Sequence, residues 1–310
     1  MNYENLDLWM PKRWRYSFEN KAIMQLFKGN EIIFLDGGAA GEVSEPFKRL
    51  NGIVQFIRVE PRGADSLLDL DGCIYIDGGL SDSSTPFELH LNTVPSTSSR
   101  HSPNMTFLKR FDLSIAYYPR IVERIVEIQS VTIDNILKKL DLNAFNVLKF
   151  DIHSSEKYAI LGAKDSLART DFVLVETWHN ECHSNQPLHG EIEVFLSNNG
   201  FEVLSSKVSS AWHTKNADKT VNRQQLISSE MLFGRSPADL NDPLKAAVVY
   251  ELFGFIQKSK NIVKALDLSD ELKLLWIKEM TKVSVANKRR YNNYLLRSLQ
   301  KIYHLILNKL

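Results

Sequence analysis

Several features are scarce in this chain of 310 residues, and each scarcity excludes a class of protein. The two cysteines, Cys73 and Cys182, are too few and too far apart in sequence for a disulfide framework or a redox pair, which fits a reducing compartment. No stretch approaches the run of about eighteen apolar residues that a membrane-spanning helix needs, and the first residues lack the apolar segment of a signal peptide. We therefore expect a cytoplasmic protein.

An excess of charge of either sign is also lacking. The chain has 38 basic and 37 acidic residues and a formal net charge of +1, which argues against nucleic acid as a partner. Internal repeats and low-complexity segments are absent from the sequence. The length suits one large α/β domain with an additional segment, or two modest domains, and hydrophobic residues make up 44% of the chain, enough for a sizeable core.

The chain is organised around a buried strand that ends in a glycine-rich turn. Four apolar residues, 32–35, are followed by Asp36 and a run of small residues at 37–41. Pro46 is typical of the first turn of a helix, so we expect a strand, a tight turn and a helix. In a parallel sheet, glycines in such a turn let the backbone approach a ligand, and the helix offers free N–H groups. A turn without any ligand is the alternative.

Acidic residues close three further predicted strands. Glu60 follows residues 54–59, Asp151 follows 147–150, and Glu176 ends 172–176. Because the carboxyl ends of parallel strands lie along one edge, we expect these acids and Asp36 to share that edge. An acid about twenty residues after the glycines is typical of the residue that binds ribose hydroxyls, which points to Glu60. A solvated acid at a strand end is the alternative.

The remaining elements follow from periodicity and from turn residues. We expect helices at 17–27, 133–140 and 156–161, a further helix that ends at Asn199, and strands at 73–76, 122–131, 201–204 and 231–233, the last two as an antiparallel pair. Polar residues at 83–104 predict a lid or binding loop, and 205–229 predict a polar connection.

The pattern after Pro243 is helical only. Ser269 is suited to cap a helix that begins at Asp270, and residues 291–310 have an apolar face opposite a basic one. Such a face predicts packing within the protein, homo-dimerisation, or contact with an anionic membrane surface.

Short motifs in a fixed order resemble the FkbM family of S-adenosylmethionine-dependent methyltransferases over residues 31–234. They are DGGAAG at 36–41, VEP at 59–61, GLSD at 79–82, the serine pair at 98–99, VTID at 131–134, LKFD at 148–151, VE at 175–176 and GF at 200–201. The chain departs from the family at His153 and Ser154, where a Gln-Gly or Glu-Gly pair is common, and at Glu42, where a glycine is frequent.

The resemblance implies an α/β fold: a Rossmann-like class I methyltransferase sheet, mostly parallel with an antiparallel last strand, and a C-terminal helical extension. It divides the chain into a helical lead-in (1–30), a methyltransferase domain (31–236) and the extension (237–310). It implies S-adenosylmethionine as the cofactor and a hydroxyl of a sugar, glycan or related small molecule as the methyl acceptor. The implied cofactor-binding residues are Asp36, Gly38, Ala39, Glu60, Pro61, Ser81, Asp82 and Asp151, and the implied substrate loops contain Ser98, Ser99, Trp178 and His179.

Three residues after the fourth parallel strand are the candidates for catalysis. A hydroxyl is a poor nucleophile at neutral pH, so a base that takes its proton assists the transfer. We favour His153 as this base because its ordinary pKa lies closest to neutrality, with Asp151 next; Glu156 is expected to orient the acceptor or to brace the loop.

Two other functions and one metal site are alternatives to a catalytically active methyltransferase without a metal. The His153-Ser154 departure also fits a module that binds the cofactor but is catalytically weakened and has a binding or scaffolding role. A Rossmann oxidoreductase is disfavoured because the turn lacks the full G-x-G-x-x-G pattern. The spacing of a histidine and cysteine group matches no closed zinc finger, so no metal is expected; the group is His179, Cys182, His183 and His189.

Overall fold

A computed structural model describes residues 14–63 and 72–287 of the chain. These residues form two compact units. The larger unit contains residues 31–44 and 54–242, and the described part of the smaller unit contains 14–30, 45–53 and 243–287. The division of the chain into 1–30, 31–236 and 237–310 as separate domains stays a prediction.

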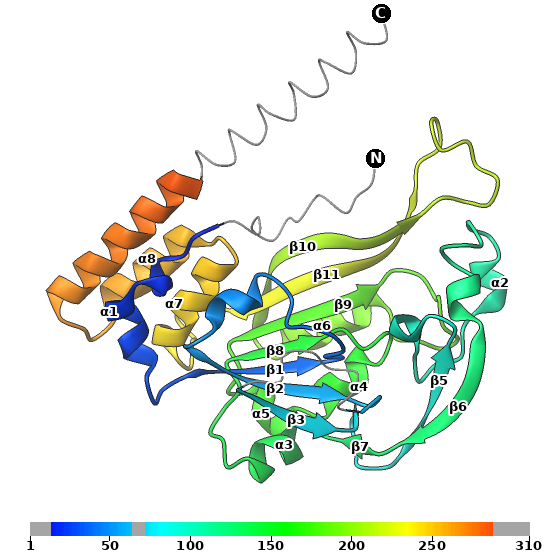
Figure 1. Ribbon diagram of the computed structural model, residues 1–310, viewed down its shortest axis with the longest axis horizontal. Coiled ribbons are helices and arrows are strands. Elements are labelled where there is room, and N and C mark those ends of the chain that lie inside the picture. Colours follow the sequence, from blue (N-terminus) through cyan, green and yellow to red (C-terminus); the bar gives the residue numbers. More distant parts are fainter. Residues whose placement is uncertain (1–13, 64–71, 288–310) are drawn as a thin grey trace, which may run out of the picture. The chain divides into compact units, whose positions relative to one another are not determined.

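A seven-stranded sheet forms the frame of the larger unit, in the order β10-β11-β9-β8-β1-β2-β3 (Figure 1). Its strands are β1 (Ile32–Gly37), β2 (Val54–Glu60), β3 (Cys73–Asp77), β8 (Val147–Phe150), β9 (Phe172–Trp178), β10 (Phe201–Trp212) and β11 (Gln225–Arg235). The five strands from β9 to β3 are parallel, whereas β11 runs antiparallel to β9 and β10 antiparallel to β11. The expected mostly parallel sheet with an antiparallel last strand is confirmed.

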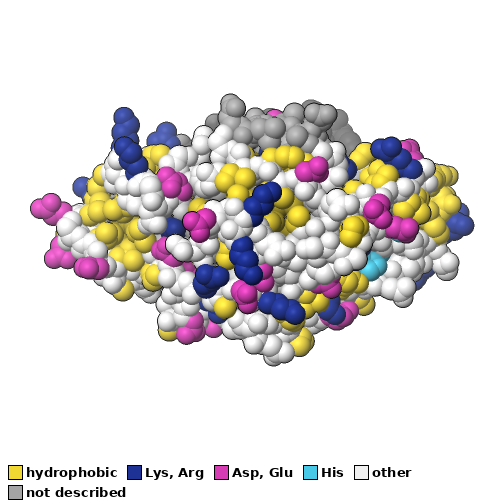
Figure 2. All heavy atoms as spheres, turned by 90° about the horizontal axis from the view of Figure 1, so that it is seen from below, with side chains coloured by type: hydrophobic (Ala, Val, Ile, Leu, Met, Phe, Trp, Pro, Cys, Tyr) yellow, Lys and Arg dark blue, Asp and Glu magenta, His cyan; other side chains and the backbone are white. Residues whose placement is uncertain are grey.

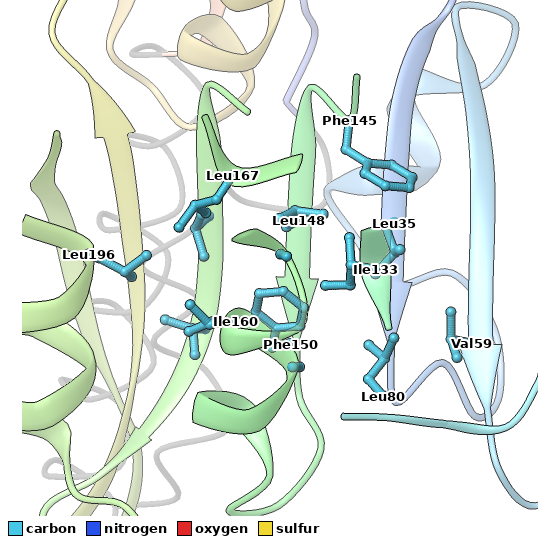
Figure 3. Close-up of a cluster of buried hydrophobic side chains, with 14 of the residues drawn as sticks. Leu35, Val59, Leu80, Ile133, Phe145, Leu148, Phe150, Ile160, Leu167 and Leu196 are labelled. Atoms are coloured by element: carbon cyan, nitrogen blue, oxygen red, sulfur yellow. The ribbon is translucent and has the colours of Figure 1, made fainter. Parts of the chain in front are cut away.

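Four helices pack their apolar side chains into one core with the sheet: α3 (Ile133–Lys139), α4 (Glu156–Leu161), α5 (Lys164–Leu167) and α6 (His189–Asn198). Figure 3 shows Ile133, Ile160 and Leu167 from three of them beside Leu148 and Phe150 of β8. Each of these side chains is at most 2% exposed, and burying one contributes roughly 1.5–3 kcal/mol. At the start of α3, Thr132 Oγ1 accepts the backbone N–H of Asn135, which confirms the expected cap.

Two short ribbons stand outside the main sheet. β4 (Gly79–Leu80) pairs in parallel with β7 (Ser130–Val131), and β5 (Phe87–Asn92) pairs antiparallel with β6 (Val122–Ile128). The predicted strand 122–131 is thus divided between two ribbons. The segment 83–104, predicted as a loop, contains strand β5; a short helix, α2 (Met105–Leu108), follows it.

Three further predictions about local structure were wrong. No α-helix follows the glycine-rich turn, because residues 45–53 contain only the 3-10 turn η4 (Phe47–Leu50). β10 and β11 extend far into the predicted connection 205–229, since polar residues occupy positions of paired strands, some exposed, such as Ser206, and some buried, such as Ser228. The predicted helix 17–27 is interrupted at Asn20, whose extended backbone and side-chain bond to Ala22 N start a new turn.

The smaller unit is helical. Its elements are η2 (Ser17–Glu19), α1 (Lys21–Met24), η3 (Gln25–Phe27), η4, α7 (Pro243–Leu252), α8 (Ile256–Ala265) and a helix over 270–287. The side chain of Glu251 accepts the backbone N–H of Ser17 at 2.5 Å and also its hydroxyl, and Trp276 Nε1 donates to Ser17 Oγ at 2.9 Å. These bonds join the first and last described helical segments. The predicted amphipathic segment 291–310 lies outside the described residues.

The described surface carries both signs of charge. On the face in Figure 2, basic and acidic side chains are interspersed with hydrophobic ones, in keeping with the near-zero net charge. Among residues 14–63 and 72–287, no helix has the length and apolar character required to cross a bilayer.

Candidate functional site

The register of the parallel strands places four acidic residues along one edge of the sheet. Gly37 of β1 is paired with Phe150 of β8, and Phe150 with Val175 of β9. The acids that follow, Asp151 and Glu176, are therefore neighbours at the carboxyl edge, with Asp36 and Glu60 at the ends of β1 and β2. The four acids therefore lie along one edge of the sheet, as the sequence predicts.

The glycine-rich turn after β1 packs directly on the backbone that follows β8. Gly38 has a φ of +77° and donates its N–H to Val59 O at 3.1 Å. A Cβ at Gly38 would lie 2.0 Å from Asp151 O, so no other residue fits there. The buried Arg58 side chain donates to the carbonyl oxygens of Ala39 and, at 2.7 Å, Gly41, which fixes the course of the turn.

A buried ion pair joins β1 to β8 just below this turn. Lys149 Nζ lies 2.7 Å from Asp36 Oδ1, and both side chains are about nine-tenths buried. Burial lowers the pKa of Lys149, but the carboxylates of Asp36 and Asp151 outweigh it and raise the pKa above its usual value. Lys149 therefore stays charged and offsets the negative charge of Asp36.

Glu60 lies at the end of β2, as predicted for a ribose-binding acid. Its side chain is 1% exposed, and Oε1 accepts the N–H of Arg62 at 3.1 Å and Arg62 Nε at 2.6 Å. Pro61 stands between the two residues in the turn. Tyr75 OH donates to Glu60 O at 3.1 Å, so the turn is fixed from β3 as well. The carboxylate is thereby held in one orientation at the strand end.

Ser81 and Asp82 follow β4 and interact with each other. Ser81 Oγ donates to Asp82 Oδ1 at 3.1 Å and accepts from Arg100 at 3.2 Å. The Arg100 guanidinium stacks 3.9 Å above the centre of the Tyr158 ring, which lies on α4. Ser81 is buried and Asp82 is exposed, so Asp82 is the one of the pair open to solvent.

The turn after β8 is strained at the two positions where the sequence departs from the family pattern. His153 has a φ of +46° and Ser154 one of +78°, a region that costs residues with a Cβ about 1–2 kcal/mol. Ser154 Oγ lies 3.0 Å from His183 Nδ1 and 3.1 Å from Gln186 Oε1. These buried contacts hold the turn in place, and the His153 ring stands 5.6 Å from that of Trp178.

Burial shifts the pKa of two titratable groups at this turn in the direction that favours the neutral form. It lowers the pKa of His153, a lowering that Asp151 opposes and that Arg120 and Arg62 reinforce. Burial likewise raises the pKa of Glu156 well above its usual range, with the Glu176 carboxyl adding to the rise. Glu156 Oε1 accepts the backbone N–H of Ile152 at 3.1 Å, so this side chain braces the turn.

Glu176 is the fourth titratable side chain beside the turn. Burial, and secondarily the nearby Asp151, raises the pKa of Glu176. Its Oε1 accepts from Ser209 Oγ at 2.8 Å and from Ser228 Oγ at 3.0 Å. Oε2 is buried and has no hydrogen-bond partner within the described residues.

The predicted substrate-loop residues occupy different surroundings. Trp178, at the end of β9, is 1% exposed and lies beside His153, while His179 Nε2 contacts Ser229 Oγ at 2.9 Å. Ser98 Oγ accepts the N–H of Asn92, and Ser99 Oγ accepts that of His101. The two serines thus fix the loop after β5, whereas Trp178 is buried beside His153 at the carboxyl edge of the sheet.

The histidine and cysteine group considered for zinc does not converge. His183 contacts Ser154, and His179 stacks 4.7 Å from His189, ring centre to ring centre. Sequence reasoning missed the role of His183 and Gln186 as supports of the strained turn. The signal in the sequence was the pair His153-Ser154. Ser154 stands where the family commonly has a glycine, so the positive φ at this position requires contacts that stabilise it.

The chain is similar to known methyltransferases. The model of one family, the methyltransferase FkbM domain, matches residues 34–203, more than half of the chain. No curated protein matches significantly.

Two solved structures are similar to the chain at 10% sequence identity. One is the magnesium protoporphyrin IX methyltransferase of Synechocystis PCC 6803 with bound SAM, with a TM-score of 0.29 over 74% of this chain and 88% of that one. The other is a SAM-dependent methyltransferase of Anabaena variabilis, with a TM-score of 0.28 over 72% and 87%. TM-scores this low carry no weight for function.

Proposed function

Because the chain belongs to the FkbM methyltransferase family, we propose that it transfers a methyl group to a hydroxyl of a sugar, a glycan or a related small molecule. Family membership makes the chain a methyltransferase, with S-adenosylmethionine as its cofactor. The hydroxyl acceptor is our proposal. The observation that supports it is the close backbone contact between Gly38 and Asp151. Gly38 lies in the turn expected to bind the cofactor, and Asp151 lies in the group of side chains expected to bind the acceptor.

The residues at the ends of β1, β2 and β4 fit this cofactor. The turn at Gly38 is open on one side, since nothing lies within 4 Å of a Cβ at Gly41. Glu60 presents a buried, oriented carboxylate, and a charged acceptor of this kind contributes about 1.5–3 kcal/mol per hydrogen bond to a ribose hydroxyl. Ser81 and Asp82 add polar groups after β4. When bound, the cofactor supplies a methyl group on a positively charged sulfur.

Positioning is the main task of the acceptor side. Holding an acceptor oxygen in line with the methyl group can supply roughly 7–11 kcal/mol of the barrier. Asp151 is exposed and follows β8, so its carboxylate is available to a hydroxyl from solvent. His153 has a ligand atom within 4.8 Å of one on Asp151, and the ring of the buried Trp178 lies beside the His153 ring.

Proton removal is the second task. His153 is neutral and has a nitrogen lone pair to offer, but its lowered pKa makes it a weak base. Asp151, two residues before His153, is the second proton acceptor that we propose. Glu156 acts as a positioning residue through its bond to Ile152 N.

Transfer of a labelled methyl group tests this function. The chain is incubated with S-adenosylmethionine that carries a radioactive methyl group and with a glycan extract, and the label is measured in the glycan fraction. We expect label in a methyl ether, loss of at least a hundredfold in rate for Asp151→Asn, and an unchanged rate for Glu202→Gln on the exposed side of β10. Calorimetric binding of the cofactor without any transfer would favour the alternative, a cofactor-binding module with a scaffolding role.

Two further proposals concern the rest of the chain. We propose a cytoplasmic location, and either homo-dimerisation or contact with an anionic membrane through residues 291–310. The support is the two-faced sequence pattern of that segment. Sedimentation and liposome flotation of a chain ending at residue 290 test both, because either association should be lost while cofactor binding is kept.

A further inference from the structure

Three side chains at the acceptor edge bring potential metal ligands together. One ligand atom each from Asp151, His153 and Glu176 lies within 4.8 Å of the other two. Within residues 14–63 and 72–287, no other group of three or more histidine, cysteine or acidic side chains converges in this way. Ligands of one ion stand about 3–4 Å apart, so a small inward movement of these side chains would complete a site.

Glu176 has an oxygen that the protein leaves without a partner. The side chain is 8% exposed, and Oε1 is held by the hydroxyls of Ser209 and Ser228. Oε2 is buried and accepts no hydrogen bond from any described residue. An unpaired buried carboxylate oxygen is costly, and an ion beside it would remove that cost.

The backbone at His153 is strained, and in this strained conformation the side chain lies near Asp151 and Glu176. Its φ of +46° and the φ of +78° at Ser154 are maintained by the contacts of Ser154 with His183 and Gln186. His153 Nδ1 is buried and has no partner in the described part of the chain. Strain that the surroundings maintain is typical of a residue positioned for a ligand.

Two of the three potential ligands are carboxyl groups, while Arg120 and Arg62 are the basic groups that act on His153. The buried Lys149 is paired with Asp36 at 2.7 Å, which leaves the carboxyl groups of Asp151 and Glu176 as the acids facing the point of convergence. Two carboxylates with one imidazole suit manganese, iron or zinc better than calcium or magnesium, because imidazole is a ligand of transition metals. Three protein ligands leave open positions on the ion, and the exposed Asp151 provides a route from solvent.

We propose that Asp151, His153 and Glu176 bind one divalent transition-metal ion, and that this ion receives the acceptor hydroxyl. The role of the ion rests on the proposed function, whereas its binding does not. A bound cation lowers the pKa of an oxygen ligand, so with the ion in place the hydroxyl releases its proton to solvent water, and Asp151 and His153 act as metal ligands instead of as proton acceptors. The oxygen then bonds to the methyl carbon as the carbon–sulfur bond breaks; the electron pair stays on sulfur and leaves S-adenosylhomocysteine.

Titration of metal-free protein with Mn²⁺ tests the binding. The full chain is treated with a chelator and dialysed, and bound Mn²⁺ is measured by the loss of the free-ion signal in electron paramagnetic resonance. We expect one ion per chain, displacement by Zn²⁺, and at least tenfold weaker competition by Mg²⁺ and Ca²⁺. A wild-type chain that binds no stoichiometric Mn²⁺ or Zn²⁺ would overturn the proposal.

Isosteric variants locate the ion. Glu176→Gln and Asp151→Asn should each weaken Mn²⁺ binding by at least tenfold, whereas Glu202→Gln, a change at an exposed position of β10, should leave it unaltered. Circular dichroism checks that each variant is folded, and the rise in the unfolding temperature of the wild type on addition of Mn²⁺ gives a measurement that needs no variant. Equal affinity in both ligand variants and the wild type would place the ion elsewhere and refute the assignment.

The two proposals fail in different ways. Methyl transfer that persists undiminished in the chelated protein would overturn the proposed role of the ion and leave the proposed function intact. Stoichiometric Mn²⁺ binding that both ligand variants abolish would support the site even if no glycan accepts a methyl group, and the proposed acceptor class alone would then be wrong.

Discussion

A Cβ atom on Gly38 would lie 2.0 Å from the carbonyl oxygen of Asp151, although the two residues follow different strands. The turn after β1 and the turn after β8 therefore meet backbone to backbone. In the proposed function the first turn binds the cofactor and the second faces the acceptor, so we expect a change in this contact to alter the alignment of the two substrates.

Two glycines in the same turn give a matched test of this contact. Gly38→Ala should destabilise the chain by about 3 kcal/mol, since the methyl group meets a backbone oxygen and φ is +77°. Gly41→Ala has a similar φ of +81° but open space around the Cβ, so a cost of about 1 kcal/mol is expected. Urea unfolding of both variants measures the difference. Equal losses would mean that the backbone approach at Gly38 is not tight.

Glu60 can be tested by cofactor affinity. Glu60→Ala should weaken S-adenosylmethionine binding at least tenfold, equivalent to about 1.4 kcal/mol, because a ribose hydroxyl loses its charged acceptor. Isothermal calorimetry measures the affinity, and Glu88→Ala, an exposed change on β5, is the control. Unchanged affinity in Glu60→Ala would remove this residue from the cofactor site.

Two substitutions at Ser154 separate its backbone strain from its hydrogen bonds. Ser154→Ala keeps the strained φ of +78° and loses the contacts with His183 and Gln186, so a loss of about 1–3 kcal/mol is expected. Ser154→Gly loses the same contacts but relieves the strain, so it should be about 1 kcal/mol more stable than the alanine variant. Thermal unfolding ranks the two. An alanine variant as stable as the glycine variant would show that the turn is unstrained.

Glu251 in the smaller unit predicts a dependence of stability on pH. Burial raises the pKa of Glu251 to about 7, although its bonds from Ser17 oppose the rise. The folded chain then keeps a proton that the unfolded chain releases above its ordinary pKa of 4.5, so stability falls by about 3 kcal/mol as the pH rises from 4.5 through 7.

The Gln variant checks the sign. Glu251→Gln has no proton to lose, so the difference in unfolding free energy between the variant and the wild type should move in favour of the variant across this window. Denaturant unfolding at several pH values measures it. A difference that does not change with pH would mean that Glu251 titrates normally in the folded chain.

The sequence was sufficient for the parallel strands and their acidic ends. Continuous apolar runs such as residues 32–35 and 172–175 are typical of strands inside a sheet covered on both faces, and Asp36 and Glu176 follow these two runs directly. The extension of β10 and β11 could not be read in this way. Their many polar residues are typical of a loop, and the strands become evident only from the pairing of Lys207 with Glu230 and of neighbouring positions.

The candidate site was accessible from sequence only in part. Asp36, Glu60 and Asp151 are marked by their places at strand ends, but nothing local indicates that Glu176 Oε2 is unpaired or that His183 supports Ser154. Those properties depend on residues about thirty or more positions apart. Likewise, the helix expected after Pro46 is only a 3-10 turn, because residues 45–53 belong to the smaller unit rather than to the sheet.

The bond between Trp276 and Ser17 has a consequence for biosynthesis, since 259 positions separate the two residues. On the ribosome, the segment around Ser17 emerges more than two hundred residues before its partners on residues 243–287 are made. The sheet of the larger unit is complete in sequence earlier, at Arg235. Phe18, Ile23 and Phe27, all buried in the finished protein, are therefore exposed during translation and are natural targets for a chaperone that binds nascent chains.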